Sequence, residues 1–380
     1  MESRFTPEQE MFRRTVAEFV KKEVAPRADE VEDKGEFPWD WFRRCAELGF
    51  FGLRYPEEVG GVGADFTTYC ILCEELARGS MSLAATVAMQ CMMGTDFIFR
   101  FGTDDHRERL LKAAIRGEKV GAFALTEPDA GTDLGGLRTT AVRDGDEYVL
   151  NGAKMWTTNS SVADFFTVLA TRDREKGVKG VDFFLVERDT PGLIIGKKID
   201  KLGTRALDTG GISFEDCRIP VENELGPEGS GLKNLLAILA RIRVMTGALG
   251  LGLARAAFEQ ALRYSRERTA FGRPIGKFQA IQHKLADMAV DVYASELMVY
   301  DAAARIDAGE RADGYAAMAK LYASEAANRC ADVATRVFAS YGYATEYPVQ
   351  RYYRDARFLL LGGGTSEILK SIIAREYWGR

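Results

Sequence analysis

The chain has 380 residues, enough to bury a large core spread over two or three domains. Its formal net charge of −5 gives no reason to expect a nucleic acid or an anionic membrane as a partner. With only two histidines, a metal site built from several imidazoles is excluded and a Ser-His-Asp triad is not expected. Catalysis would therefore come from carboxylates or from a bound cofactor.

The six cysteines form no evident disulfide framework or zinc site. Cys70 and Cys73 have C-x-x-C spacing, but they lie in a predicted helix with no second pair nearby, so buried thiols are expected. The first ten residues lack the apolar core of a signal peptide, and no apolar run reaches membrane-spanning length. We expect a reduced, cytoplasmic protein that does not insert into a membrane.

Residues 1–120 are predicted to form an N-terminal all-α domain. Thr6 followed by Pro7 is a helix-start signal, and apolar residues recur behind it at helical spacing. The segment 83–101 is apolar nearly all round, which predicts one long buried helix. Asp96 is the only acid in that segment.

Residues 121–228 are predicted to form a middle β-barrel-like domain, because short apolar runs alternate there with turn signals. Asp144-Gly145 and Asn151-Gly152 are both predicted to be two-residue hairpin turns. The predicted strands are 139–142, 148–150, 154–157, 165–170 and 183–186.

Residues 229–380 are predicted to form a C-terminal four-helix bundle with short connections, which gives the chain an α+β fold. The predicted helices are 232–266, 279–308, 312–340 and 366–377. Three glycines at 362–364 precede the last one, and Thr365 or Ser366 offers an N-cap hydroxyl. A glycine loop leading into a helix start can bind a cofactor, because free backbone N–H groups and the helix dipole point the same way. A plain connection is the alternative.

Five motifs occur in order along the chain. They are Ala-Leu-Thr-Glu-Pro-Asp-Ala-Gly-Thr-Asp at 124–133, Asn-Gly-Ala-Lys-Met-Trp-Thr-Thr-Asn at 151–159, Arg-Thr-Ala-Phe-Gly at 268–272 with Gln279 and Gln282, Tyr347-Pro348 with Arg354-Asp355-Ala356, and Gly364-Thr365-Ser366. Together they resemble the acyl-CoA dehydrogenase family of FAD flavoproteins. The resemblance implies an α–β–α domain order, bound FAD, an acyl-CoA thioester substrate, an electron-transfer flavoprotein as acceptor and a homotetramer.

The resemblance also assigns positions to the cofactor and the substrate. The positions expected to contact FAD are Phe123, Leu125, Thr126, Gly131, Thr132, Trp156, Thr158, Arg268, Phe271, Gln279, Arg336, Ser340, Thr365 and Glu367. Those expected to contact the thioester are Thr132, Arg241 and Gly363. Trp156 would stack on the flavin ring, while Arg268 and Phe271 would reach the FAD of a neighbouring subunit. Arg336, Ser340 and Glu367 stand where the family commonly has Gln, Gly and Gln.

The customary catalytic base is missing. Most of the family carries a Glu where this chain has Gly363, and a minority carries it on the first bundle helix, where this chain has Ala240. One interpretation is that Asp96 is a relocated base with a raised pKa, acting on a cyclic acyl-CoA such as a cyclohexene-carboxyl thioester by 1,4-elimination. In the alternative for Asp96, the carboxylate pairs with Arg100 at i+4.

Two further interpretations of the missing base stay open. The enzyme could need no α-proton base, as in a relative that releases sulfite from a sulfinate-bearing acyl-CoA. Such relatives hold the distal anion with an arginine, and the matching segment 81–87 has none. The chain could also be a catalytically silent subunit that binds FAD and acyl-CoA.

Overall fold

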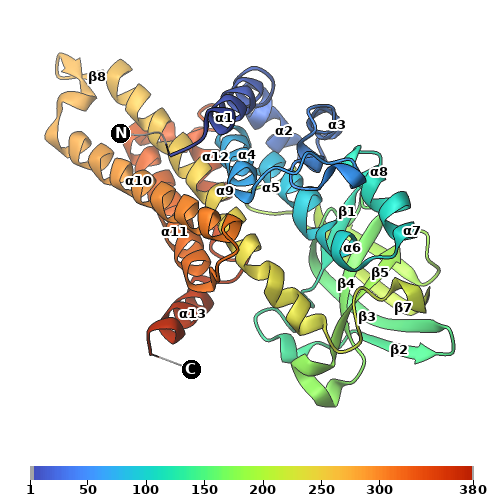
Figure 1. Ribbon diagram of the computed structural model, residues 1–380. Helices are drawn as coiled ribbons and strands as arrows, with labels where there is room; N and C mark the ends of the chain where they lie inside the picture. The colour runs from blue at the N-terminus through green and yellow to red at the C-terminus, as the bar shows by residue number, and fades with distance from the viewer. Residues whose placement is uncertain (1–3, 379–380) are drawn as a thin grey trace.

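The computed structural model describes residues 4–378. An N-terminal set of helices, a middle sheet and a C-terminal helical bundle follow one another along the chain, as predicted from the sequence. Helix α9 (Gly231–Glu267) leaves the β domain, crosses the N-terminal helices and enters the bundle (Figure 1). It packs closely against α4 and α11. All three parts of the chain therefore meet along α9.

The N-terminal helices start at clear capping residues. The Thr6 hydroxyl accepts from the Gln9 N–H at 3.2 Å and the Gln9 side chain accepts from the Thr6 N–H, which completes a capping box. Asp65 caps α4 by accepting from the N–H of Thr68 at 2.7 Å. The α-helices are α1 Pro7–Phe19, α2 Ala28–Lys34, α3 Trp39–Glu47, α4 Phe66–Gly79, α5 Met81–Ala88, α6 Asp96–Phe101, α7 Asp104–His106 and α8 Lys112–Ile115.

The single helix predicted over 83–101 is interrupted. After α5 the chain forms a π-helical turn, η5 (Met89–Met93), and α6 begins only at Asp96. Thr95 donates its hydroxyl to the Gln90 carbonyl at 2.6 Å, which competes with the helical ladder. A Cβ on Gly94 would lie 2.7 Å from the Gly121 carbonyl carbon, so the break lets this segment approach β1 closely. Asp96 consequently lies in the first turn of a short helix.

The middle domain is a mixed seven-stranded sheet in the order β1-β4-β2-β3-β7-β6, with β5 paired to β4. The strands are β1 Gly121–Ala124, β2 Thr140–Asp144, β3 Glu147–Thr158, β4 Phe165–Thr171, β5 Val181–Glu187, β6 Leu193–Lys198 and β7 Thr209–Pro220. The hairpin predicted at Asp144-Gly145 joins β2 to β3, with Asp144 opposite Glu147.

The hairpin predicted at Asn151-Gly152 is wrong. β3 runs through both residues and forms an irregular register with β7 there. The Asn151 side chain accepts from the Asp216 N–H at 2.9 Å, and its amide donates to the Asp216 carboxylate at 3.1 Å. Gly152 has φ 142, and a Cβ there would lie 2.6 Å from the Thr139 Cα. The Asn-Gly pair therefore makes a β-bulge instead of a turn.

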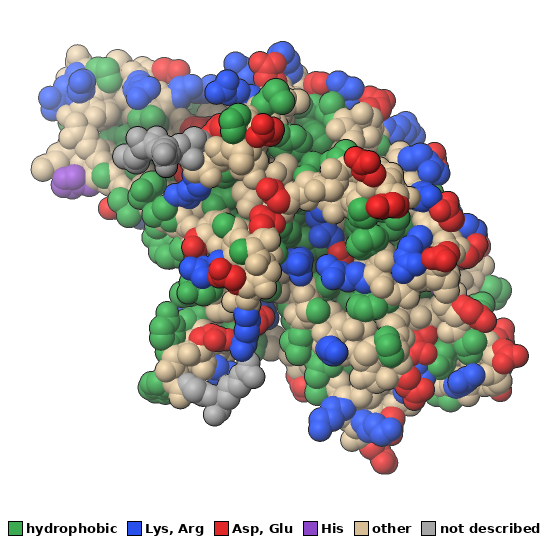
Figure 2. Space-filling view, viewed as in Figure 1, with side chains coloured by type: hydrophobic (Ala, Val, Ile, Leu, Met, Phe, Trp, Pro, Cys, Tyr) green, Lys and Arg blue, Asp and Glu red, His purple; other side chains and the backbone are tan. Residues whose placement is uncertain are grey.

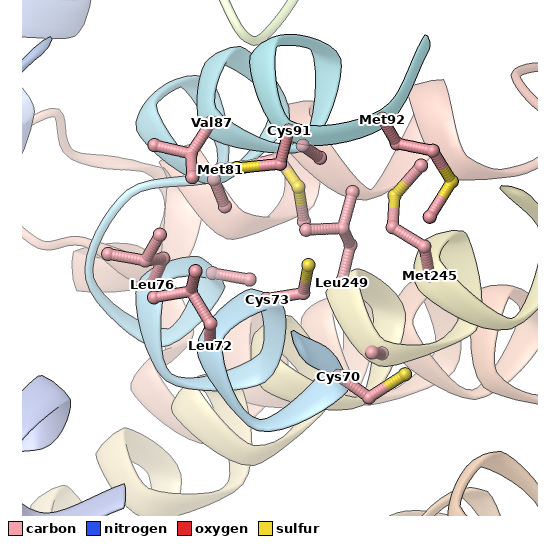
Figure 3. Packing of buried hydrophobic residues seen from close by; sticks show 14 of the residues in the cluster. Cys70, Leu72, Cys73, Leu76, Met81, Val87, Cys91, Met92, Met245 and Leu249 are labelled. Carbon is pink, nitrogen blue, oxygen red and sulfur yellow. The ribbon is translucent and has the colours of Figure 1, made fainter. Parts of the chain in front are cut away.

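The C-terminal helices are α9, α10 Gln279–Asp307, α11 Asp313–Phe338, α12 Val349–Leu359 and α13 Ser366–Trp378, with a small hairpin, β8 Thr269–Ala270 and β9 Arg273–Pro274, between α9 and α10. The four long helices were predicted, whereas α12 was not. Figure 3 shows Cys73 of α4, Cys91 and Met92 of η5, and Met245 and Leu249 of α9 packed into one core. All six cysteines are buried free thiols, which confirms the prediction made for Cys70 and Cys73.

Two helical stretches, Met81–Phe101 and Gly231–Glu267, are long and apolar enough to cross a membrane by length and composition alone. Their apolar windows are 89% and 67% buried inside the protein, as expected of core helices. Among residues 4–378 no group of His, Cys, Asp and Glu side chains could hold a metal ion.

Candidate active site

The edge formed by β1 and β3 brings together residues predicted to contact the flavin ring. The Met155 N–H donates to the Thr126 carbonyl at 2.8 Å, which fixes the loop after β1 against β3. Trp156 lies where the β3–β7 register shifts, with φ 61 and 57% of its surface exposed. The neighbouring Thr157 hydroxyl is buried without a partner, and Thr158 is half-buried on the same strand. An exposed indole beside hydroxyl groups fits a planar, hydrogen-bonding cofactor such as FAD.

A buried ion pair holds this edge in shape. The Lys154 ammonium donates to Glu127 at 2.8 Å and to the Leu125 carbonyl at 3.1 Å. Burial lowers the pKa of Lys154 to about 8 although Glu127 opposes the shift. Glu127 also accepts from the N–H groups of Arg138 and Thr139, at 2.6 and 2.9 Å. The Phe123 ring is stacked on Phe97 and Phe183, with ring centroids 5.7 Å apart in both pairs, so only part of it could contact a ligand.

Other predicted cofactor residues lie elsewhere. Arg268, Phe271 and Gln279 cluster around the β8–β9 hairpin, at the far end of the bundle from the sheet (Figure 1). Phe271 is 95% exposed, and the Arg268 guanidinium lies 5.7 Å from the Tyr341 ring. Within one chain the structure does not bring these residues to Trp156. Their exposure suits the predicted contact with the cofactor of a neighbouring subunit.

The remaining predicted positions are also solvent-accessible. Arg336 pairs with Asp332 at 2.8 Å, Ser340 is exposed beyond α11, and Gly131 and Thr132 are exposed in the loop after β1. Glu367 lies in the first turn of α13, where a backbone N–H and the Thr365 hydroxyl lower its pKa.

The glycine loop turns as predicted and lies against α9. Gly363 and Gly364 have φ 72 and φ 105, and the Thr365 hydroxyl accepts from the Ile368 N–H at 3.4 Å at the start of α13. Lys320, fully buried in α11, donates to the Gly364 carbonyl at 2.6 Å. Burial lowers the pKa of this lysine to about 8. A Cβ on Gly363 would lie 3.0 Å from the Thr246 hydroxyl of α9. The loop is therefore held from both sides.

The expectation that Asp96 is an unpaired acid with a raised pKa is wrong. Its carboxylate is 2% exposed and accepts hydrogen bonds from Arg54 on one oxygen and from Arg100, at 2.5 Å, on the other. Burial alone would raise the pKa of Asp96, but the two guanidinium groups outweigh burial and lower it. The pairing with Arg100 at i+4 is the alternative that the sequence offered. A carboxylate held in this way is a weak proton acceptor.

Asp96 lines a cavity of about 260 Å³ together with Arg54, Arg100 and Arg241. Two other acids line it, and both cap α4. Asp65 accepts from Thr68 and from Gln9, while Asp307 accepts from the N–H groups of the first turn at 2.6 and 2.9 Å. Figure 2 shows Lys and Arg side chains gathered beside α6 near the centre of this face. Arg54 was not foreseen, because a lone arginine in a loop carries no periodic signal.

Comparison with known proteins gives one answer over the whole chain. Models described as the N-terminal, middle and C-terminal domains of acyl-CoA dehydrogenases match residues 6–118, 122–217 and 229–377. The chain is 50% identical over 377 residues to a benzylmalonyl-CoA dehydrogenase of Aromatoleum aromaticum, covering 99% of both chains. It is 40% identical to a 3-(aryl)acrylate reductase of Clostridium sporogenes over 97% of this chain and 98% of that one.

Solved structures agree. Butyryl-CoA dehydrogenase of Megasphaera elsdenii matches with a TM-score of 0.96 at 37% identity, covering 100% of both chains. A chain in a structure titled as the electron transferring flavoprotein of Acidaminococcus fermentans matches with a TM-score of 0.97 at 37% identity, also over 100% of both. The chain belongs to the acyl-CoA dehydrogenase family and is an FAD-dependent oxidoreductase.

Proposed function

We propose that the enzyme oxidises 2-carboxyacyl-CoA thioesters of the benzylmalonyl type, with carbon dioxide as the group that leaves C2. The observation that carries this proposal is the lack of a free carboxylate where a base is needed. Gly363 and Ala240 stand where the resemblance predicts a base, and Asp96 is bonded to two arginines. The relative at 50% identity is named for benzylmalonyl-CoA, which bears a carboxylate on C2.

Loss of carbon dioxide replaces removal of the C2 proton. The bond between C2 and the carboxylate carbon breaks, and its electron pair forms the double bond between C2 and C3. The C3 hydrogen departs with its two electrons as a hydride, for which bound FAD is the acceptor. With benzylmalonyl-CoA the products would be cinnamoyl-CoA, carbon dioxide and the reduced cofactor. No side chain has to accept a proton at C2.

The chain's own residues would orient the reactants and exclude water. Trp156 and the hydroxyls of Thr126 and Thr158 would hold the cofactor ring at the β1–β3 edge. Gly363 has no side chain, and a Cβ there would lie 3.0 Å from the Thr246 hydroxyl, so the glycine lets the loop lie close to α9. Lys320 fixes that loop through the Gly364 carbonyl.

Mixing the FAD-loaded enzyme with benzylmalonyl-CoA under anaerobic conditions tests the proposal. We expect bleaching of the visible flavin band, one carbon dioxide released per flavin reduced, and cinnamoyl-CoA as product. As a control, 3-phenylpropanoyl-CoA has the same chain with a proton in place of the carboxylate, and it should bleach the flavin far more slowly. Bleaching by benzylmalonyl-CoA with retention of the carboxylate would refute the proposal.

The same assay separates the other candidates from the sequence. A cyclohexene-carboxyl thioester with Asp96 as base predicts bleaching by that thioester alone, with loss of activity in Asp96→Asn. A sulfinate-bearing thioester predicts release of sulfite. A catalytically silent subunit predicts no bleaching by any thioester. The arginine pairing of Asp96 argues against the first of these.

We also propose that the enzyme works in the cytoplasm as a homotetramer with an electron-transfer flavoprotein as acceptor. The exposed Phe271 and the unpaired apolar surface of α10, which includes Val290 and Tyr293, support assembly through the bundle. Light scattering of the FAD-loaded enzyme tests the subunit number. Turnover with purified electron-transfer flavoprotein, compared with turnover with oxygen, tests the acceptor.

A further inference from the structure

Three guanidinium groups from separate parts of the chain line one cavity. Arg54 follows the short helix η3 (Phe50–Gly52), Arg100 lies on α6 and Arg241 on α9. We call them the arginine cluster. Arg54 is nearly buried, with 9% of its side chain exposed, and Arg100 is 33% exposed. Because like charges repel, such a cluster persists only where anions balance it.

Asp96 balances only part of this charge. It pairs with Arg54 and Arg100, whereas among residues 4–378 Arg241 has no carboxylate within 4 Å. Within the described part of the chain, the only hydrogen bond of the Arg241 side chain is to the Ala237 carbonyl at 3.4 Å. Asp65 and Asp307 line the same cavity, but their oxygens accept from N–H groups at the start of α4 and from the Gln9 side chain. Arg241 is thus the guanidinium of the cluster that has no carboxylate partner among the described residues.

The surroundings of Arg241 favour an anionic ligand. Its pKa is lowered first by burial and then by the positive charge of Arg100. An ordinary surface arginine reaches bulk water and is not depressed in this way. A carboxylate can accept two parallel hydrogen bonds from a guanidinium, so it is the ligand that would stabilise a half-buried arginine near other cations most strongly.

Two of the helices that carry the cluster, α9 and α6, also reach the glycine loop and β1. Arg241 follows Ala240, where the resemblance predicts a base on α9, and a Cβ on Gly363 would lie 3.0 Å from the Thr246 hydroxyl of the same helix. On the other side, Phe97 of α6 stacks on Phe123 of β1. The cavity is therefore flanked by the helix that meets the glycine loop and the helix that meets the flavin-binding edge.

We propose that Arg241, with Arg54 and Arg100 behind it, binds the C2 carboxylate of the thioester substrate. This inference rests on the proposed function and names the residue that selects its substrate class. Asp96 keeps the cluster assembled before the substrate enters and offsets part of its charge. Arg241 contacts the substrate, whereas Asp96 acts only by positioning the arginines.

The chemistry fixes which kinetic constant should change. The carboxylate is charged in the bound substrate and becomes neutral as carbon dioxide leaves, so its attraction to Arg241 weakens on the way to the transition state. Arg241 should therefore contribute to binding and not to the chemical step. Replacing it should raise KM and leave kcat unchanged or higher.

The test uses the FAD-loaded enzyme and the variants Arg241→Gln and Arg241→Lys. For each, KM and kcat are measured with benzylmalonyl-CoA, and the dissociation constant of 3-phenylpropanoyl-CoA is measured from the change in the flavin spectrum. Loss of a charge-assisted hydrogen-bonded pair should raise KM for benzylmalonyl-CoA about 10- to 100-fold in Arg241→Gln. Binding of 3-phenylpropanoyl-CoA should change less than roughly threefold, since this thioester has no C2 carboxylate to pair with Arg241.

Arg241→Lys keeps the charge but loses the two-pronged geometry, so its KM should lie between those of wild type and Arg241→Gln. The Lys variant also keeps the test decisive if Arg241→Gln does not fold. Arg116→Gln is the matched control, because Arg116 is an exposed arginine paired with Glu118 and lies outside the cavity. Its constants should equal those of wild type.

Equal weakening of both thioesters in Arg241→Gln, or a fall in kcat with unchanged KM, would overturn the inference. Failure of the proposed function looks different, because the wild-type enzyme would then release no carbon dioxide. In that case a preference for benzylmalonyl-CoA over 3-phenylpropanoyl-CoA in binding alone, lost in Arg241→Gln, would still support the anion site.

Discussion

Replacing Asp96 by Asn separates a structural counter-ion from a catalytic base. The carboxylate is buried and bonded to Arg54 and Arg100, and Arg54 is itself almost buried. Removing one partner of a buried ion pair costs about 3–5 kcal/mol, because the other charge stays buried without compensation. Asn keeps one acceptor oxygen and Arg100 can turn to water, so we expect the lower end of that range.

A loss of about 3 kcal/mol can be converted to a melting temperature. With an unfolding entropy of about 2.1 cal/mol/K per residue, it lowers the Tm by about 4 °C if the whole chain unfolds as one unit, and by more if the N-terminal helices unfold alone. Thermal unfolding followed by circular dichroism and by release of flavin fluorescence measures the shift. Asp104→Asn is the control, since the Asp104 side chain is 99% exposed and pairs with Arg107 at the surface. Its Tm should not change measurably.

The difference should also depend on pH. Because the pKa of Asp96 is lowered in the folded protein, the pair stabilises the fold above the ordinary pKa of an aspartate, and this contribution is lost as the pH falls through the lowered value. The Tm gap between wild type and Asp96→Asn should thus be full at pH 7 and shrink in strong acid. An unchanged Tm together with a loss of turnover beyond the roughly 100-fold minimum for a general base would refute this reasoning and restore Asp96 as the base.

Three further outcomes follow from the structure. Burial and the neighbouring Glu32 raise the pKa of Asp355 from 3.8 to about 7. Protonated Asp355 therefore stabilises the fold at low pH, and this contribution is lost as the pH rises through 7. The Tm of Asp355→Asn should exceed that of wild type at pH 8 but not at pH 4. Gly152→Ala should lower the free energy of unfolding in urea by about 3 kcal/mol, because the added Cβ would clash with the backbone of Thr139, the residue before β2. Gly145→Ala should lower it by only about 1 kcal/mol, because Gly145 has φ 64 but open space around it. Ala240→Glu should let the enzyme reduce its flavin with 3-phenylpropanoyl-CoA. Gly363→Glu should do so more slowly and should lose about 1–2 kcal/mol of stability, because residue 363 has φ 72. Equal rates of flavin reduction and equal Tm values in the two variants would contradict this prediction.

Helices whose pattern is local were predicted closely. The period of apolar residues placed the first bundle helix at 232–266, and α9 spans Gly231–Glu267. The hairpin predicted at Asn151-Gly152 was wrong because its position depends on contacts that are distant in sequence. A turn signal is a local preference of about 1 kcal/mol, and pairing of β3 with β7 on both sides of the pair outweighs it.

The candidate site divides in the same way. Motifs that are contiguous in the sequence predict Thr126 and Trp156 as FAD contacts, and the structure places the two near each other because the loop after β1 lies against β3. The environment of Asp96 was only half visible. Arg100 is one helical turn away and could be foreseen, but Arg54 is 42 residues distant and reaches Asp96 only through the tertiary fold. A pKa shift that depends on such a partner cannot be read from sequence.

Removal of a proton and release of carbon dioxide make opposite electrostatic demands on one site. A general base is an anion that becomes neutral when it takes up the proton, so nearby cations lower its pKa and weaken it. A substrate carboxylate needs cations in order to bind, yet cations that bind it too strongly would hold it in the ground state. Asp96 satisfies both conditions under the proposed function, because it assembles Arg54 and Arg100 while cancelling part of their charge. The missing carboxylates at 240 and 363 and the arginines around Asp96 then have one cause, a different leaving group at C2.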